Sequence, residues 1–423
     1  MDCEGLIPKI DEEILRVSRF CYQCGECTGA CPLRRVSRFS PRSFVYNLLA
    51  SSDSDKEEIS ALSSSSSSHS PQSTPSIFNT KEQWNCMICE NCYIICPQGV
   101  DFPALILDLR REEGAKAKEE DILAHRIFSE IATFMTYFDK GVPTDFKGET
   151  DKESEYGYFP GCLDYLDLFM DVGVNYHEIG DYAVKLLNEI GIKPRIVSLK
   201  CCGHDVFYQG NYKIFEQLAS YNTEKIKEMG IKKLVVSCAE GFLTFKNYYE
   251  LEAMGVEVIH ISQLLSERME FSDVEKARNR AIAVTYHDPC AMKRFQLYDA
   301  PRDAIKKSGV KYVELTHSKD NSLCCGVSGM MNCNDMSKAL RAFRLDEVKE
   351  KEVDVLVTTC PKCLSHFSCL KHESEREKEE EKEGEGEEGR EKKEKSECKG
   401  GYNFEIVDLT VFLGRLLESQ KRY

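Results

Sequence analysis

The chain of 423 residues contains 21 cysteines, and most of them occur in short clusters at defined spacings. The segment from His287 to Phe367 includes "TYHDPC", "LCCGVSG" and "TTCPKC", which supply Cys290, Cys324, Cys325, Cys360 and Cys363. The adjacent pair can hold two different metal ions, because consecutive side chains point in divergent directions. Gly326, which follows the pair, permits a tight turn and a close approach of the backbone to a ligand. Thiolate ligands must be deprotonated and gathered, so these five thiols predict a metal cluster rather than packing alone.

Reduced, metal-binding cysteines suit this chain better than disulfides. The N-terminus "MDCEGLIPKIDEEILR" has neither the basic region nor the apolar region of a secretory signal, so we expect a cytoplasmic protein. The net charge of −15 argues against non-specific binding to nucleic acid or anionic lipid. No apolar run approaches the ~18 residues that a membrane span needs, so we expect any membrane contact to go through a partner.

Two complete ferredoxin-type cysteine runs occur in the N-terminal part of the chain. Both "CYQCGECTGACP" and "CMICENCYIICP" match the pattern C-x2-C-x2-C-x3-C-P. In two-cluster ferredoxins the fourth cysteine of each run ligates the other cluster. We therefore predict two cubane 4Fe-4S clusters, one held by Cys21, Cys24, Cys27 and Cys96 and the other by Cys86, Cys89, Cys92 and Cys31. Zinc is the alternative for any Cys-x-x-Cys pair, but zinc favours two separate pairs of ligands over this doubled run.

Composition divides the chain into two domains. We expect a helical two-cluster domain over residues 1–139, a linker over 140–155, and a second domain over 156–423. Two low-complexity segments, the serine-rich 51–76 and the charged 371–400, have few hydrophobic residues and are predicted to be disordered. His69, in the first of them, is expected to be an ordinary loop histidine.

The second domain shows an internal duplication, with halves at 156–270 and 280–416. The strands expected in the first half are "YGYFPGC", "PRIVSLKCCG", "KLVVSCAEG" and "VEVIHIS". Those expected in the second half follow in the same order: "AIAVTYHDPC", "KYVELTHSKDNSLCCG", "VDVLVTTCPKC" and "NFEIVDLT". Strands that alternate with helices predict an α/β fold with mostly parallel sheets and right-handed crossovers. The cysteines come directly after strands, and open α/β sheets build their sites at the carboxyl ends of strands.

The first half has an incomplete cysteine set. It supplies Cys162, Cys201, Cys202 and Cys238, but Gly241 stands where the second half has its last cysteine. Three outcomes remain open for this site: a second cluster with one iron open to substrate or water, a cubane held by four thiolates, or a vacant structural relic.

Several other residues near the motifs are candidates for function. His204 and His287 can donate protons to a leaving thiolate, since histidine titrates near neutrality, or they can be strand-end histidines bonded to the backbone. The cations Lys293, Arg294 and Arg302 can clamp an anionic substrate, or they can be exposed helix ends. Cys333 and Cys369 are expected to be small buried hydrophobic residues, and no role is assigned to Cys3 and Cys398.

The pattern of one cysteine, then Cys-Cys-Gly, then Cys-x-x-Cys resembles the CCG domain of heterodisulfide reductases and related iron-sulfur reductases. The stretch "EQWNCMICENCYIICPQGVDFPALILDLRREEGA" is similar to the C subunit of these enzymes, and the domain order resembles that of their D subunit. This resemblance implies a non-cubane 4Fe-4S cluster on Cys290, Cys324, Cys325, Cys360 and Cys363, in addition to the two cubanes.

The function that the resemblance implies is anaerobic reduction of the coenzyme M–coenzyme B heterodisulfide in methanogenesis. Electrons would come from a membrane cytochrome b-type subunit or another donor subunit, which would hold the chain at the inner face of the membrane. A similar domain order occurs in iron-sulfur subunits of sulfite-reductase-associated membrane complexes and of glycolate or glycerol-3-phosphate dehydrogenases. An electron-transfer role is therefore the alternative, and a purely structural or regulatory iron-sulfur protein is a third. No glycine-rich dinucleotide or Walker motif is evident.

Overall fold

A computed structural model of the protein describes residues 12–50, 80–114, 127–141, 144–327, 333–384 and 401–418. The predicted serine-rich loop, Cys3, His69 and Cys398 lie outside these residues. Within them, no helix is both long enough and apolar enough to cross a membrane.

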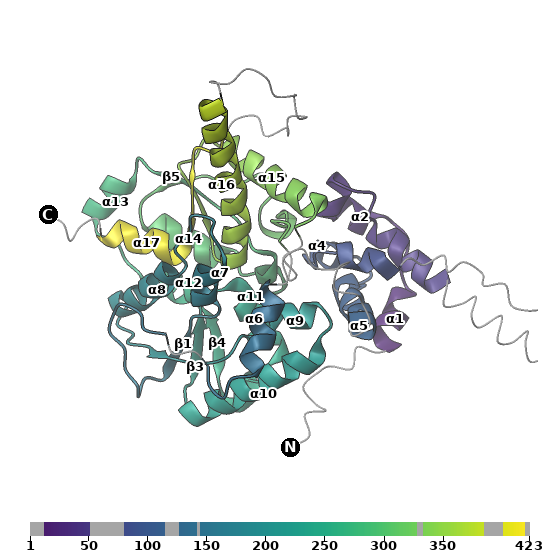
Figure 1. Ribbon diagram of the computed structural model, residues 1–423, viewed down its shortest axis with the longest axis horizontal. Coiled ribbons are helices and arrows are strands. Elements are labelled where there is room, and N and C mark those ends of the chain that lie inside the picture. The colour runs from purple at the N-terminus through teal and green to yellow at the C-terminus, as the bar shows by residue number, and fades with distance from the viewer. Residues whose placement is uncertain are drawn as a thin grey trace, which may run out of the picture.

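The N-terminal domain is a small group of short helices around the two ferredoxin-type runs (Figure 1). Its elements are α1 (Glu12–Ser18), α2 (Glu26–Ala30), η2 (Pro32–Arg35), a helix over 41–50, η3 (Thr80–Asn85), α4 (Asn91–Ile94) and α5 (Phe102–Gly114). Phe39, Phe44 and Phe102 form its aromatic centre, with ring centroids 5.4 to 6.3 Å apart. Because these rings come from three separate segments, they fix the two cysteine runs against each other.

The second domain contains two four-stranded parallel sheets with the same strand order, as the duplication predicts. The first sheet, in the order β2-β1-β3-β4, consists of β1 (Tyr156–Phe159), β2 (Arg195–Ile196), β3 (Lys233–Val236) and β4 (Glu257–His260). The second, in the order β6-β5-β7-β8, consists of β5 (Ala283–Tyr286), β6 (Lys311–Tyr312), β7 (Val355–Thr358) and β8 (Glu405–Asp408). The predicted fold class and all eight predicted strands are confirmed.

Helices cover both sheets. The helices of the first half are α7 (Leu163–Phe169), α8 (His177–Glu189), α9 (His204–Tyr208), α10 (Tyr212–Met229), α11 (Ala239–Tyr248) and α12 (Ile261–Arg268), with η5 (Glu252–Met254). After α13 (Asp273–Asn279), the second half has η6 (Cys290–Phe295), α14 (Asp299–Lys307), η7 (Lys319–Asn321), α15 (Asp335–Lys349), α16 (Pro361–Gly384) and α17 (Leu409–Glu418).

The two halves exchange their closing helices. Helix α12 packs on α14 of the second half, and α17 packs on α8 of the first half. The contact of α17 with α8 is close, because a Cβ added at Gly414 would lie 2.1 Å from the ring of Tyr182. At the strand ends, the backbone N–H of Ala239 donates to the carbonyl of Thr359 at 3.0 Å. The carboxyl ends of β3 and β7, where the cysteines lie, therefore face each other.

Two sequence expectations about domain organisation need correction. Helix α16 continues to Gly384, into the segment 371–400 that was expected to be disordered. Alternating Glu and Lys favour a helix through contacts one turn apart, such as Lys371 with Glu375. In addition, α6 (Ile127–Thr136), which the sequence assigned to the N-terminal domain, packs on α9 and α10 of the second domain.

Candidate functional site

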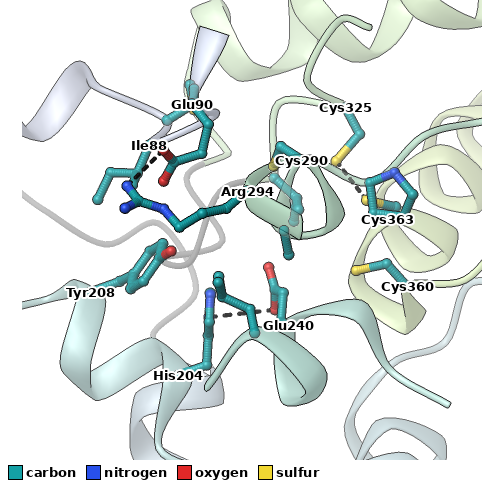
Figure 2. Close-up of a pocket in the computed structure, with 15 residues that line it drawn as sticks. Ile88, Glu90, His204, Tyr208, Glu240, Cys290, Arg294, Cys325, Cys360 and Cys363 are labelled. Carbon is teal, nitrogen blue, oxygen red and sulfur yellow. Dashed lines mark hydrogen bonds and ion pairs between the residues drawn. The ribbon is translucent and has the colours of Figure 1, made fainter. Parts of the chain in front are cut away.

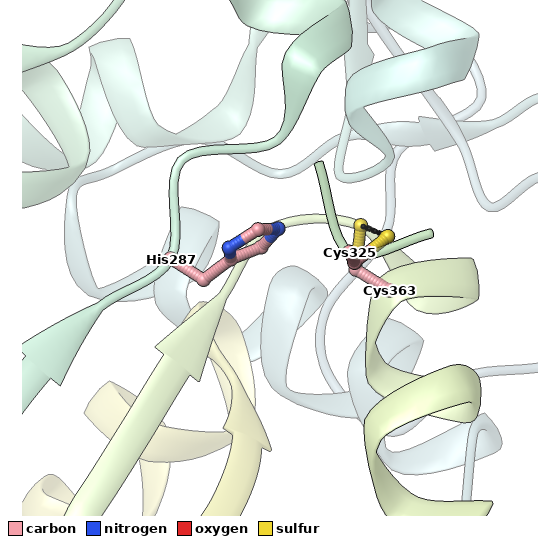
Figure 3. A group of neighbouring side chains, drawn as sticks. All are labelled: His287, Cys325 and Cys363. Carbon is pink, nitrogen blue, oxygen red and sulfur yellow. Dashed lines mark hydrogen bonds between the residues drawn. The ribbon is translucent and has the colours of Figure 1, made fainter. Parts of the chain in front are cut away.

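The second half gathers the five cysteines that the sequence predicted to form its site. Cys290 begins η6 after β5, the pair Cys324 and Cys325 lies in the loop after β6, and Cys360 and Cys363 lie at the start of α16 after β7. The Sγ atoms of Cys325 and Cys363 are 3.0 Å apart (Figures 2 and 3). Hydrogen bonding to Cys324 and burial raise the pKa of Cys290, so its thiol also belongs to this group.

The turn after the cysteine pair requires glycine, as the sequence predicts. Gly326 has φ +88°, and a Cβ there would lie 2.5 Å from the carbonyl oxygen of Ser337. The backbone N–H of Gly326 points at the sulfur of Cys324 at 3.3 Å. Gly203, at the equivalent place in the first half, has φ +84° and donates to Cys201 Sγ at 3.4 Å. Both turns therefore present an amide to a sulfur, the arrangement that tunes iron-sulfur sites.

The thiols of the two ferredoxin-type runs surround two cavities, and the crosswise assignment of ligands stays a prediction. Cys21, Cys24, Cys27 and Cys96 line one cavity, and Cys31, Cys86 and Cys89 line a second; Cys92 borders both. Burial raises the pKa of Cys86 to about 12 and that of Cys89 to about 11, so these thiols would remain protonated without a metal ion to stabilise the thiolates. The first group is partly open to solvent through Cys24, whereas the second is buried.

The donor sets fit iron-sulfur clusters. Each group places several thiols around one small cavity, and amide groups point at the sulfurs, including Ile88 N to Cys86 Sγ at 3.4 Å and Val100 N to Cys96 Sγ at 3.3 Å. The five-thiol group of the second half shares these features, because four of its thiols line one cavity and the amide of Gly326 points at the sulfur of Cys324. These chemical features agree with residues that hold 4Fe-4S clusters; which of the clusters are cubane remains a prediction.

The first half does not assemble a comparable site around all of its cysteines. Cys162 and Cys201 are 3.9 Å apart, and Cys202 is adjacent in sequence. Cys238, however, is hydrogen-bonded to Cys360 of the second half, an interaction that together with burial raises the pKa of Cys238. Gly241 contributes only its backbone N–H, which points at Cys238 Sγ at 3.5 Å. The fourth thiol of the first half therefore lies toward the second site.

A buried ion network, which the sequence analysis missed, joins the two halves. Lys362 Nζ donates to Asp205 and lies 2.6 Å from Glu240 Oε2, and all three side chains are buried. His204 Nδ1 is 3.5 Å from the same oxygen of Glu240 (Figure 2). His204, Asp205 and Glu240 have the geometry of a metal site, but Lys362 already supplies the cation. Glu240 and Lys362 occupy equivalent positions in "CAEG" and "CPKC", so the duplication was the available signal.

His287 lies beside the thiols but does not titrate near neutrality. It is fully buried, and burial lowers its pKa to about 3. Arg344 Nε donates to its Nδ1 atom at 3.2 Å, so the neutral ring carries its proton on Nε2. A ring nitrogen lies within 4.8 Å of the sulfurs of Cys325 and Cys363 (Figure 3). His204 is also buried, and burial lowers its pKa. Both histidines are therefore neutral at pH 7.

The three cations that the sequence singled out all have partners within the protein. Lys293 donates to Asn91 and, at 2.6 Å, to the carbonyl of Ser322. Arg294 pairs with Glu90 at 2.7 Å and with Asp101 at 3.3 Å, both in the N-terminal domain.

The third cation, Arg302, forms ion pairs with Asp288 and Glu314. The interpretation of these residues as exposed helix ends is wrong for the buried Lys293 and Arg302. Their ion pairs and hydrogen bonds also leave no support for a substrate clamp. Cys333 and Cys369, expected to be buried, are each partly exposed.

One cavity connects the cysteines of the second half with the other elements. It is lined by Cys290, Cys325, Cys360 and Cys363, by His204, Tyr208 and Glu240 of the first half, and by Met87, Ile88 and Glu90 of the N-terminal domain (Figure 2). Arg110 fixes the N-terminal domain at this place, because it donates to Cys86 O at 2.7 Å and to Tyr208 O at 3.2 Å. All three parts of the molecule therefore meet where the five thiols lie.

Comparisons with known proteins agree with this domain assignment. Residues 18–100 match the family model of a 4Fe-4S dicluster domain, and residues 156–246 and 284–368 match that of CCG, a cysteine-rich domain. The chain is 26% identical over 369 residues to the D subunit of the dihydromethanophenazine:CoB–CoM heterodisulfide reductase of Methanosarcina mazei, with 81% of this chain and 86% of that protein covered. It is 24% identical over 390 residues to the EtfAB:quinone oxidoreductase of Syntrophomonas wolfei, with 82% of this chain covered.

The chain spans only 54% of the length of the Syntrophomonas protein. A crystal structure of a hypothetical protein from Helicobacter pylori shares the fold, with a TM-score of 0.56 at 10% sequence identity. The superposition covers 99% of this chain and 77% of the Helicobacter chain. The cysteine geometry and these similarities lead to the same family. The chain belongs to the CCG family of iron-sulfur oxidoreductases, with a 4Fe-4S dicluster domain ahead of a duplicated cysteine-rich domain.

Proposed function

We propose that this protein is the iron-sulfur subunit of a disulfide reductase and that its substrate is the coenzyme M–coenzyme B heterodisulfide. The reaction breaks one S–S bond, takes up two electrons and two protons, and releases two thiols. The bound clusters would supply electrons one at a time. The electron donor is proposed to be a partner subunit. For a heterodisulfide reductase, this partner would be a membrane cytochrome b-type subunit.

The observation that carries this proposal is the cavity into which four thiols of the second half project. Cys290, Cys325, Cys360 and Cys363 would hold the cluster together with Cys324, and a disulfide in the cavity would lie against them. Apolar side chains of Met87, Ile88 and Leu243 line the same cavity and exclude water. The second ferredoxin-type run, whose Cys86, Cys89 and Cys92 are buried, also contributes Met87 and Ile88 to the cavity lining. This proximity supports electron delivery from the N-terminal domain.

Proton-bearing groups of the chain lie in this cavity or beside its thiols. His287 holds a proton on Nε2, the ring nitrogen that has no hydrogen-bond partner among the described residues. His204 and Glu240 line the cavity from the first half. Since His287 and His204 are both neutral, we propose that they orient sulfur atoms through N–H groups rather than act as charged acids.

A second candidate function is electron transfer to or from a quinone-linked or flavoprotein partner, with no small disulfide as substrate. Two observations favour it. Gly241 breaks the ligand set of the first half, and Lys293, Arg294 and Arg302, the cations expected to bind an anionic substrate, all have protein partners. The similarity to the Syntrophomonas protein supports this alternative.

One assay separates the two functions. The purified, iron-loaded chain is mixed anaerobically with a reduced viologen dye and the coenzyme M–coenzyme B disulfide, with the two symmetric disulfides as controls. We expect rapid dye oxidation only with the mixed disulfide. If a chain with reducible clusters gives no oxidation with any disulfide, electron transfer to a partner replaces disulfide reduction as the proposed function.

A further inference from the structure

Lys293 is a buried cation whose hydrogen-bond acceptors are neutral. The side chain is 1% exposed, and its Nζ donates to the amide oxygen of Asn91 and to the carbonyl of Ser322. Among the described residues, no carboxylate lies within ion-pair distance of it. Lys362, another buried lysine beside the thiols of the second half, contrasts with it, because two carboxylates contact that ammonium group.

The carboxylates nearest to Lys293 are already paired with other cations. Asp288 receives two hydrogen bonds from Arg302, at 2.6 and 2.7 Å. Glu90 pairs with Arg294 at 2.7 Å. Burying an ammonium group without a counter-charge is costly, so the fold places Lys293 where an anion other than a carboxylate must balance it.

Besides Asp288, which Arg302 already pairs, the groups that act on Lys293 are cysteines of two different sites. Cys89, of the second ferredoxin-type site, and Cys290 and Cys324, of the CCG site, all act electrostatically on its ammonium group. Cys89 in turn acts electrostatically on Cys324, and the hydrogen bonds of Lys293 show how the two sets of thiols are brought together.

The hydrogen bonds of Lys293 connect the loops that carry these cysteines. Asn91, its acceptor, precedes Cys92 and donates to the carbonyls of Ala30 and Ser322 at 3.1 and 3.3 Å. Ala30 precedes Cys31, and Ser322 lies two residues before Cys324. Lys293 and Asn91 together therefore connect loops from both ferredoxin-type runs and from the CCG site.

We propose that Lys293 is the shared counter-ion of two iron-sulfur clusters, one on Cys31, Cys86, Cys89 and Cys92 and the other on the five cysteines of the CCG site. Its positive charge stabilises the more negative, reduced state of each cluster, and so favours passage of electrons between them. Lys293 is a positioning residue that acts through the clusters. This inference rests on the proposed occupancy of both sites, and the site of Cys21, Cys24, Cys27 and Cys96 provides an internal reference within the same molecule.

The test is a dye-mediated redox titration of the iron-loaded chain, followed by electron paramagnetic resonance. Lys293→Met removes the charge and keeps most of the side-chain volume. We expect both flanking clusters to become harder to reduce, by at least tenfold in the reduced-to-oxidised ratio, about 59 mV for one electron. The reference cluster should not shift. Lys293→Arg, which keeps the charge, should restore potentials near those of the wild type.

A second pair of variants decides the question if Lys293→Met does not take up iron. Asn91→Asp and Asn91→Ala both remove the amide donor to Ala30 and Ser322, but only the aspartate gives Lys293 a carboxylate partner. We expect Asn91→Asp to lower both flanking potentials and Asn91→Ala to leave them near the wild type. Equal potentials in these two variants, or unchanged potentials in an iron-loaded Lys293→Met, would overturn the inference. A wild-type chain that binds no iron would instead contradict the proposed function.

Discussion

Gly241 determines what the first half can bind. The position has room for a side chain, because a Cβ there would lie 3.6 Å from the Cβ of Cys238, an ordinary contact distance. Glycine is therefore not required by packing at this place, and no positive φ demands it. The loss of the fifth thiol is a chemical difference between the halves, while the backbone that would support a ligand at position 241 is intact.

Restoring the thiol tests the state of this site. We expect Gly241→Cys to fold normally and to raise the iron content from about twelve to about sixteen atoms per chain, since the added thiol completes a five-cysteine set. Serine has nearly the same volume as cysteine but no thiol, so Gly241→Ser should leave the iron content unchanged. Anaerobic iron and sulfide analysis measures both. If the wild type already contains about sixteen irons per chain, the first site is occupied without the fifth thiol and this prediction is wrong.

At the level of residues, the grouping of the cysteines was easier to predict from the sequence than the partners of the charged side chains. The cysteines could be grouped because their motifs are local and the turns between them are fixed by Gly203 and Gly326. Asn91, one partner of Lys293, and Glu90, a partner of Arg294, each lie about 200 positions away in the chain, and no local pattern encodes such a contact. The same limit applies to the contact of Cys238 with Cys360 across the two halves.

At the level of elements, the ion network of Lys362 connects the start of α16 with α9 and α11. The first half contributes the two negative charges of the network, Asp205 and Glu240, and the second half contributes the positive charge of Lys362. Since these charges are buried, removing one partner leaves the others without compensation. The network therefore fixes the relative position of the two halves next to the thiols.

We expect Lys362→Met to lower the free energy of unfolding by about 3–5 kcal/mol, the typical result of breaking a buried ion pair. Lys371→Met, on the same helix, is the matched control. Its ammonium group is partly exposed and donates to the carbonyl of Phe404, so the cost should be below about 1 kcal/mol. Urea unfolding under anaerobic conditions measures both. Similar losses in the two variants would show that the network does not stabilise the contact between the halves.

The strands and their order were predictable from the sequence, whereas the end of α16 was not. Short apolar runs before cysteine motifs mark β1, β3, β5 and β7 clearly, and the duplication predicts that the two sheets share one arrangement, which they do. The charged segment after Lys371 has the composition of a disordered insertion, but α16 continues to Gly384, and Lys371 pairs with Glu375 one turn further along the helix. The low hydrophobicity of this segment prevents it from packing in a core, but a helix that is exposed to solvent can still form there.

In the whole molecule, the three complete groups of thiols are arranged from the surface inward. The group of Cys21, Cys24, Cys27 and Cys96 is partly open to solvent, the group with Cys86 and Cys89 is buried, and four of the five CCG cysteines are buried beside the cavity. This order supports electron flow from an exposed site to the place where a substrate would bind. The N-terminal domain and the CCG site fold from separate segments, so one can be altered while the other is kept.

Cys363→Ser uses this separation. Cys363 lies on α16, contacts Cys325 within the CCG site, and belongs to neither ferredoxin-type run. We expect disulfide-dependent dye oxidation to fall to the rate measured without protein, while the magnetic resonance signals of both ferredoxin-type clusters persist. Cys369→Ser, six residues further along the same helix and outside the thiol group, should keep full activity. Turnover retained in Cys363→Ser would remove the CCG thiols from the reaction, and signals lost from all clusters would show that the sites do not assemble independently.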